Sequence, residues 1–211
     1  MGHASDHRLL MLHALRLRGF VPADVLADGT GFAVADVEAT LVDLDAGGLA
    51  RYREGRMTGW MLTPDGRAEG ERLLADELDA AGRRDLVMAC YEAFLARNSE
   101  MLEVCTAWQM REEDGEQKVN DHRDVAYDAD VIERLGVLDA TVQPICADLA
   151  DGLARFAGYG PRFTSSLEKI RMGDSDWFTK PMIDSYHTTW FELHENLLAS
   201  LGIDRASEGA H

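Results

Sequence analysis

The sequence predicts a mainly α protein with one small β-hairpin near its N-terminal end. Three observations predict this class: apolar residues recur at helical spacing along most of the chain, one stretch between residues 49 and 63 reads as strand, turn and strand, and Gly and Pro mark the breaks between segments. The order of these segments predicts two domains. Residues 1–80 contain the hairpin, and residues 81–211 are expected to form a helical bundle.

Three short helices are expected before the hairpin. The first spans residues 7–18 and ends at a glycine, the second runs from about 22 to 27, and a turn over residues 28–31 leads to the third, residues 34–46. The third helix has four apolar residues at the spacing of one core-facing side: Val34, Val37, Leu41 and Leu44.

A hairpin and a return helix follow. Residues 49–53 and 57–63 have the composition of two strands, and Glu54-Gly55 suits the turn between them. Pro64-Asp65-Gly66 then opens a long helix that is expected to reach about residue 80.

Three helices, a hairpin and a return helix form the winged helix-turn-helix pattern. Leu44, Gly48-Leu49, the basic hairpin and above all Leu62-Thr63-Pro64-Asp65-Gly66 resemble the third helix, the wing and the wing exit of MarR-type regulators, over about residues 7–78. The resemblance implies a DNA-binding domain. MarR proteins usually begin with a longer dimerisation helix than the six residues here permit, so their dimer and ligand site are not carried over.

The second domain is expected to be almost entirely helical. One extended polar loop is expected over residues 113–124, and Pro144 is expected to kink or split the longest helix. The predicted helices span residues 83–97, 99–112, 125–157, 161–172 and 181–201.

Composition and charge describe a soluble protein. The net charge is −17, of which residues 1–72 carry −3, so most of the acidity lies in the second domain. No apolar run is long enough to cross a bilayer and no secretion signal is visible, which predicts a cytoplasmic protein without a membrane partner. The three cysteines lack metal-ligand spacing and are expected to be buried, reduced thiols: Cys90, Cys105 and Cys146.

The wing carries the candidate DNA-binding residues. Arg51, Arg53 and Arg56 surround Tyr52, and guanidinium groups on a hairpin can contact phosphates or enter the minor groove. The alternative is that these arginines are simply solvated. The third helix opposes DNA binding, because its outward side offers carboxylates and only Thr40 as a neutral polar contact.

The second domain holds candidate ligand-binding residues. Aromatic and imidazole side chains could line an effector pocket: Trp108, His122, Trp177, Tyr186, His187, Trp190 and His194. They could equally be packed core residues or part of a dimer seam. A divalent metal ion is a weaker alternative, because His187 and His194 lie roughly 10 Å apart along a straight helix. No cofactor is therefore expected.

No nucleophile elbow, phosphate-binding glycine loop or Cys-x-x-Cys motif is present, so we do not expect an enzyme. The sequence predicts a homodimeric transcriptional regulator that binds double-stranded DNA and responds to a small-molecule effector. Two other classes stay open. One is a protein–protein adaptor that uses the winged helix as its interaction surface, and the other is a metal- or ligand-binding protein with a vestigial winged helix.

Overall fold

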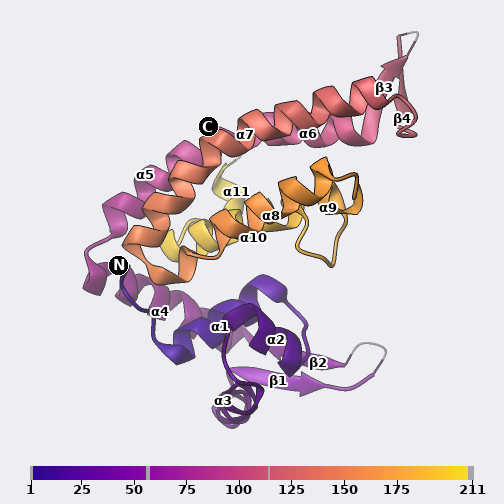
Figure 1. Ribbon diagram of the computed structural model, residues 1–211. Helices are drawn as coiled ribbons and strands as arrows, with labels where there is room; N and C mark the ends of the chain where they lie inside the picture. The colour runs from indigo at the N-terminus through magenta and orange to yellow at the C-terminus, as the bar shows by residue number, and fades with distance from the viewer. Residues whose placement is uncertain (1, 56–57, 114, 209–211) are drawn as a thin grey trace. The chain divides into compact units, whose positions relative to one another are not determined.

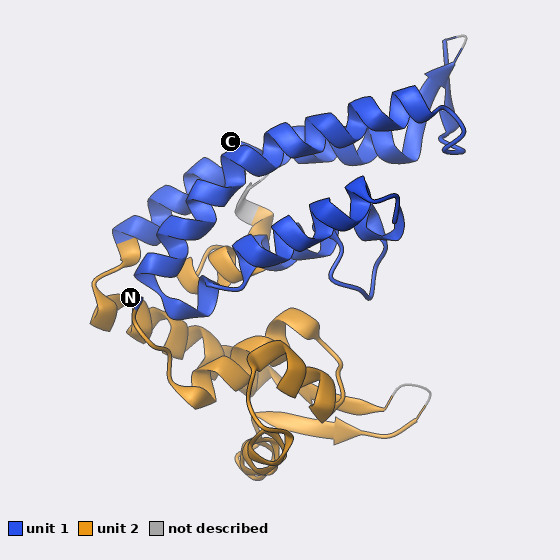
Figure 2. Cartoon of the chain, viewed as in Figure 1, with its two compact units in different colours: residues 1–2, 85–194 blue, residues 3–84, 195–211 orange. Residues whose placement is uncertain are grey.

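The computed structural model is mainly helical and contains two small antiparallel strand pairs (Figure 1). It describes residues 2–55, 58–113 and 115–208. The chain divides into two compact units (Figure 2): unit 2 consists of residues 3–84 and 195–211, and unit 1 of residues 1–2 and 85–194. The break after residue 84 lies close to the expected boundary after residue 80, whereas residues 195–211 group with the N-terminal unit.

Unit 2 contains the three expected helices, the hairpin and the return helix. In chain order they are α1 (His7–Arg18), α2 (Ala23–Thr30), α3 (Val34–Ala46), β1 (Ala50–Arg53), β2 (Gly59–Leu62) and α4 (Pro64–Ala81), followed by the C-terminal part of α10 (Tyr186–Leu201) and α11 (Arg205–Glu208). The expected turn over residues 28–31 is wrong in part, because α2 continues through Thr30. The Thr30 hydroxyl donates to the Leu26 carbonyl at 2.7 Å, and the helix ends at Gly31 with a φ of 74°.

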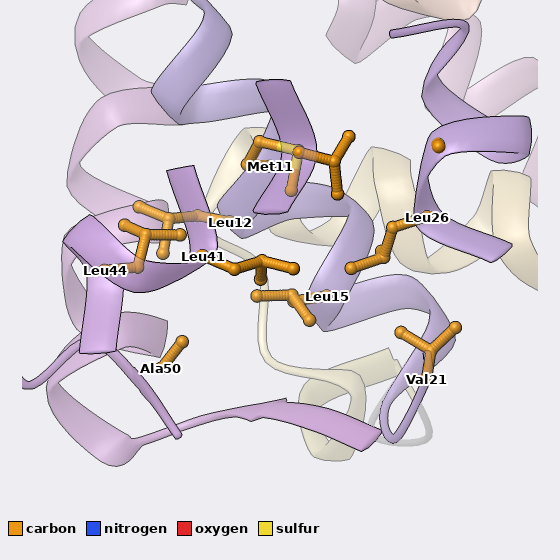
Figure 3. Packing of buried hydrophobic residues seen from close by; sticks show 10 residues of the cluster. Met11, Leu12, Leu15, Val21, Leu26, Leu41, Leu44 and Ala50 are labelled. Atoms are coloured by element: carbon orange, nitrogen blue, oxygen red, sulfur yellow. The ribbon is translucent and has the colours of Figure 1, made fainter. Parts of the chain in front are cut away.

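The core of unit 2 draws on one side of each of its first three helices (Figure 3). Its buried members include Met11, Leu12, Leu15, Leu26, Val37, Leu41, Leu44 and Ala50. Ala50 carries this core onto the hairpin, and Trp60 and Leu62 pack against it from β2. Val34 was expected in the core, but it is 45% exposed because it occupies the first position of α3, at the edge of the cluster.

The start of α4 lies against the backbone that enters the hairpin. Thr63 caps the helix by accepting from the Gly66 N–H at 3.0 Å, and its hydroxyl donates to the Gly48 carbonyl at 2.7 Å. The Thr63 N–H donates to the Leu49 carbonyl at 3.1 Å. A Cβ on Gly66 would lie only 1.8 Å from the Leu49 carbonyl oxygen. Glycine is therefore required for this approach of two backbone segments.

Unit 1 is a set of helices with a second hairpin. It contains α5 (Arg84–Leu95), α6 (Asn98–Gln109), β3 (Met110–Glu113), β4 (Glu116–Val119), α7 (Val125–Gly152), a 3-10 turn η1 (Ala154–Phe156), α8 (Tyr159–Arg171), α9 (Asp176–Thr179) and the first part of α10. Helix α7 packs against both α6 and α8.

Several sequence expectations for unit 1 are wrong. The described residues form two hairpins rather than one, because β3 replaces the end of the helix expected over residues 99–112 and β4 lies in the stretch assigned to a polar loop. The helix expected over residues 125–157 ends at Gly152, and Pro144 lies inside α7 without splitting it, since a proline removes only one N–H of the helical ladder. The alternative, a kink at Pro144, stays a prediction. The last long helix begins at Tyr186 rather than near residue 181, and the short α9 precedes it.

Two glycines of α4 provide a matched test of the close approach between the backbones of α4 and Leu49. Gly66→Ala is expected to lower the free energy of unfolding by about 2 kcal/mol or more, because neither backbone segment can move away without breaking the Thr63 contacts. Gly70→Ala places its Cβ 3.6 Å from the Leu12 Cβ, which is an ordinary contact, and is expected to be neutral or to stabilise by up to about 1 kcal/mol. Urea unfolding of both variants measures the difference, and equal stabilities would contradict the close approach.

Candidate nucleic-acid interface

The hairpin β1–β2 has two chemically different faces. Tyr52 pairs with Trp60, and Ala50 pairs with Leu62. Because side chains alternate along a strand, these four residues share the inner face, and the Tyr52 and Trp60 ring centroids lie 5.3 Å apart. Arg51 and Arg53 lie at the alternate positions and therefore on the outer face.

The two arginines of the outer face are exposed. Within the described part of the chain, neither Arg51 nor Arg53 forms an ion pair or a side-chain hydrogen bond, so both guanidinium groups are free to bind a ligand. The third arginine predicted for the wing, Arg56, lies outside the described residues.

A third chain segment holds the hairpin against the helices. Val21 forms an antiparallel bridge with Trp60, with the Val21 N–H donating at 3.0 Å and the Trp60 N–H donating at 2.8 Å. A Cβ on Gly59 would lie 2.8 Å from the Val21 carbonyl group, so the two backbones approach closely here as well. Arg51 and Arg53 thus lie on β1, whose inner face packs against the core and whose partner strand β2 is held at its other edge by Val21.

Helix α3 presents an acidic surface. It contains no lysine or arginine, and four of its carboxylates are exposed: Asp36, Glu38, Asp43 and Asp45. Thr40 is half-buried, and its hydroxyl donates to the Asp36 carbonyl at 2.8 Å, which leaves only its acceptor capacity for another partner.

An open groove lies between the inner face of the hairpin and helices α2 and α3. Its volume is about 670 Å³, and its lining residues are Pro22, Ala23, Glu38, Val42, Tyr52, Thr58, Gly59 and Trp60. Trp60 and Val42 were not predicted as site residues from the sequence. The hairpin register, which pairs Trp60 with the predicted residue Tyr52, is the signal that could have identified Trp60.

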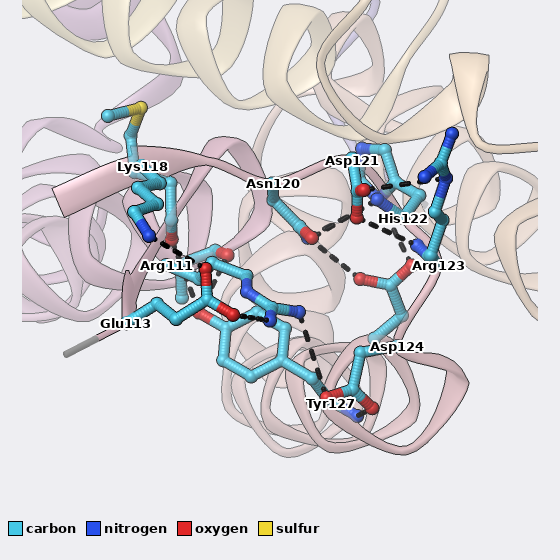
Figure 4. A network of polar contacts seen from close by, with 12 residues as sticks. Arg111, Glu113, Lys118, Asn120, Asp121, His122, Arg123, Asp124 and Tyr127 are labelled. Atoms are coloured by element: carbon cyan, nitrogen blue, oxygen red, sulfur yellow. Dashed lines mark hydrogen bonds and ion pairs between the residues drawn. The ribbon is translucent and has the colours of Figure 1, made fainter.

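Two of the predicted ligand-binding residues meet in unit 1. The Trp108 ring stacks on Phe178 with centroids 4.3 Å apart and lies 4.5 Å from the His122 ring. His122 is held by a 3.0 Å contact between its Nδ1 and Asp128 Oδ2, next to Asn120, whose side-chain amide donates to Asp128 Oδ1 at 2.8 Å (Figure 4). This network fixes the loop that joins β4 to α7.

The other predicted ligand-binding residues have separate partners. Trp190 donates to Asn98 Oδ1 at 3.2 Å and lies, like His194, against the Phe94 ring. Tyr186 is fully buried and donates to Asp139 at 3.1 Å. The Lys169 ammonium lies 3.2 Å from the centre of the Trp177 ring, and His187 is exposed.

Among the described residues, no group of three or more His, Cys, Asp or Glu side chains is arranged to hold a metal ion. Nor does any described helix have the length and apolar character needed to cross a membrane.

An ion-pair network that the sequence did not reveal joins α8 to α10. The Arg162 guanidinium contacts Asp184 Oδ1 at 2.9 Å and Glu192 Oε2 at 2.7 Å. Burial by itself would lower the pKa of Arg162, but the carboxylates of Glu192 and Asp184 raise it above its ordinary value. Arg162 is therefore ion-paired with carboxylates of unit 1, whereas Arg51 and Arg53 have no ion-pair partner among the described residues.

No protein-family model, no curated protein and no solved structure matches the chain.

The three cysteines are buried and free, as the sequence predicted. Burial raises the pKa of Cys90 to about 11 and that of Cys105 and Cys146 to about 12. At pH 8 a thiol of pKa 12 has a roughly thousandfold smaller thiolate fraction than one of pKa 9, so we expect almost no reaction of the native protein with a disulfide reagent such as DTNB. All three thiols should react after denaturation. Fast reaction of one equivalent with folded protein would contradict this.

Proposed function

We propose that the protein is a DNA-binding transcriptional regulator and that unit 2 is its winged-helix domain. The order of elements supports this assignment, because three helices are followed by a hairpin and a return helix. The Val21–Trp60 bridge supports it further, since it adds a third segment to the hairpin in front of α2. The resemblance to MarR-type regulators found in the sequence points in the same direction.

The observation that carries the proposal is the pair of free guanidinium groups on the outer face of the hairpin. Arg51 and Arg53 are two residues apart on one strand, so their Cα atoms are separated by roughly 7 Å, which suits contacts with neighbouring phosphates. Arginine pairs well with phosphate because its donors match the phosphate oxygens in geometry and charge. A strand fixed at its inner face presents these groups with little loss of backbone entropy on binding.

The acidic surface of α3 limits which base edges this interface can recognise in DNA. Carboxylates repel phosphates, and they accept hydrogen bonds only from the cytosine amino group among the major-groove edges. Contacts from the hairpin to the DNA backbone give affinity and position but little sequence information. We therefore propose binding that is dominated by the wing, with Thr40 as a minor contact of α3.

A regulator of this kind works as a homodimer in our proposal. One small module buries too little surface for tight specific binding, and two copies double the number of phosphate contacts. Unit 1 supplies the dimer contacts, and a small-molecule effector acts through the same unit.

The acidic face of α3 favours a second candidate function, an adaptor that binds a basic protein. Four exposed carboxylates on one helix attract a cationic partner and repel nucleic acid. In that case the outer arginines of the hairpin are solvated, and DNA binding is absent at any salt concentration.

DNA binding can be tested by fluorescence anisotropy on a duplex from upstream of the protein's own gene, over a series of salt concentrations. For the Arg51→Ala/Arg53→Ala variant we expect weaker binding. The slope of log affinity against log salt should become shallower by about 4 for the proposed dimer, because two phosphate contacts are lost in each protomer, and by about 2 for a monomer.

The matched control is Arg123→Ala/Arg134→Ala, which removes two exposed arginines of unit 1 and changes the net charge equally. Its salt slope should equal that of the unaltered protein. If both double variants lose affinity alike, the effect belongs to overall charge and the wing has no special role. If the folded protein does not bind DNA even at low salt, the adaptor becomes the better proposal.

The dimer can be tested separately by sedimentation equilibrium. The expected mass is twice the 23.4 kDa of the chain. A monomer at the concentrations used for DNA binding would contradict the dimer without affecting the test of the wing.

A further inference from the structure

The groove between the hairpin and helices α2 and α3 has the chemistry of a ligand site, and it lies on the opposite face of the hairpin from Arg51 and Arg53. We propose that it binds a small organic cation, a quaternary or alkylated ammonium group on a short apolar body. This proposal does not depend on DNA binding, because neither Arg51 nor Arg53 is among the described residues that line the groove.

Aromatic rings supply the first part of the site. Tyr52 and Trp60 are paired across the strands with their ring centroids 5.3 Å apart, and both line the groove. Tyr52 is 47% exposed, so the ring can meet a ligand. A cation over such a ring is attracted by the negative potential of the π face, most strongly over tryptophan. Alkylated ammonium ions suit this surface because their charge is weakly hydrated.

A carboxylate supplies the second part. Glu38 lines the groove from α3, is exposed and, within the described residues, has no cationic partner. The described lining residues include no lysine, arginine or histidine, so none of them neutralises the charge of Glu38. The groove thus combines one negative charge with two aromatic rings, and the ligand complementary to both is a cation.

Apolar residues supply the third part and set the ligand size. Pro22 and Val42 line the groove, and Val42 is 61% exposed although it is a large aliphatic residue. The volume of about 670 Å³ falls in the range typical of small-molecule sites. A basic segment of a protein would also bring charge. However, walls from the start of α2, from α3 and from both strands form a recess that fits a compact ligand.

The experiment compares choline with 3,3-dimethylbutan-1-ol, which has nearly the same shape but no charge. Each is titrated into ¹⁵N-labelled full-length protein, and the indole N–H signal of Trp60, assigned with Trp60→Phe, reports binding at the groove. We expect choline to shift the Trp60 signal saturably and to bind at least about fivefold more tightly than the neutral alcohol, because the interactions with Glu38 and the rings require the charge.

Two substitutions on one helix separate the groove from general electrostatics. Glu38→Gln should weaken choline binding about fivefold and leave binding of the alcohol unchanged. Asp43→Asn removes an exposed carboxylate of the same helix that does not line the groove, and it should leave choline binding unchanged. Both positions are exposed, so neither substitution removes a core contact.

Three results would overturn the proposal. The first is equal binding of choline and the alcohol, which would make the groove merely apolar. The second is equal weakening by both substitutions, which would make the effect one of net charge. The third is a Trp60 signal that responds to a lysine-containing peptide but not to choline, which would assign the groove to a protein partner. Loss or retention of DNA binding decides none of these outcomes, so the two proposals fail independently.

Discussion

The contact between the N-terminal turn of α4 and the carbonyl of Leu49 determines where the hairpin of unit 2 can lie. Thr63 connects three backbone groups at this point: it accepts from the N–H of Gly66, and it donates to the carbonyls of Gly48 and Leu49. Since these bonds join the strand exit to the strand entry, the two ends of the hairpin are fixed relative to α4. Only glycine at position 66 allows the two backbones to approach this closely. The placement of the described residues of β1 and β2 depends on this constraint.

Once the ends of the hairpin are fixed, the alternation of side chains along a strand places the aromatic residues on one face and the arginines on the other. Ala50 is buried in the core, so Tyr52 must lie on the same inner face and Arg51 and Arg53 on the outer face. A slip of one residue would turn Arg51 inward, toward the core position that Ala50 occupies. The desolvation of this unpaired guanidinium group disfavours that register. The same alternation thus selects the register and produces the two surfaces on which the proposals depend.

The sequence predicted the parts of the fold whose signals are local. Leucines at helical spacing and flanking glycines placed α1 and α3 to the residue, and Thr63-Pro64 placed the start of α4. The hairpin β3–β4 was missed because its strands consist largely of charged and polar residues, whose alternation gives only a weak strand signal. The ligand candidates of unit 1 could not be grouped from the sequence. Trp108 meets His122 and Phe178 only because distant segments pack together.

The distribution of charge explains how a chain of net charge −17 can carry both a phosphate-binding face and a cation-binding groove. At physiological ionic strength the Debye length is about 8 Å, so an exposed charge acts mainly on its immediate surroundings. The outer face of the hairpin carries two free arginines, whereas the described residues of the groove include Glu38 and no cation. Each surface therefore presents its own local sign. At low ionic strength the remaining carboxylates act over longer distances and oppose DNA, while counterion release favours it. Strong binding by the arginine face thus requires that the local contacts outweigh this long-range repulsion, and the salt range in which DNA is bound measures their balance.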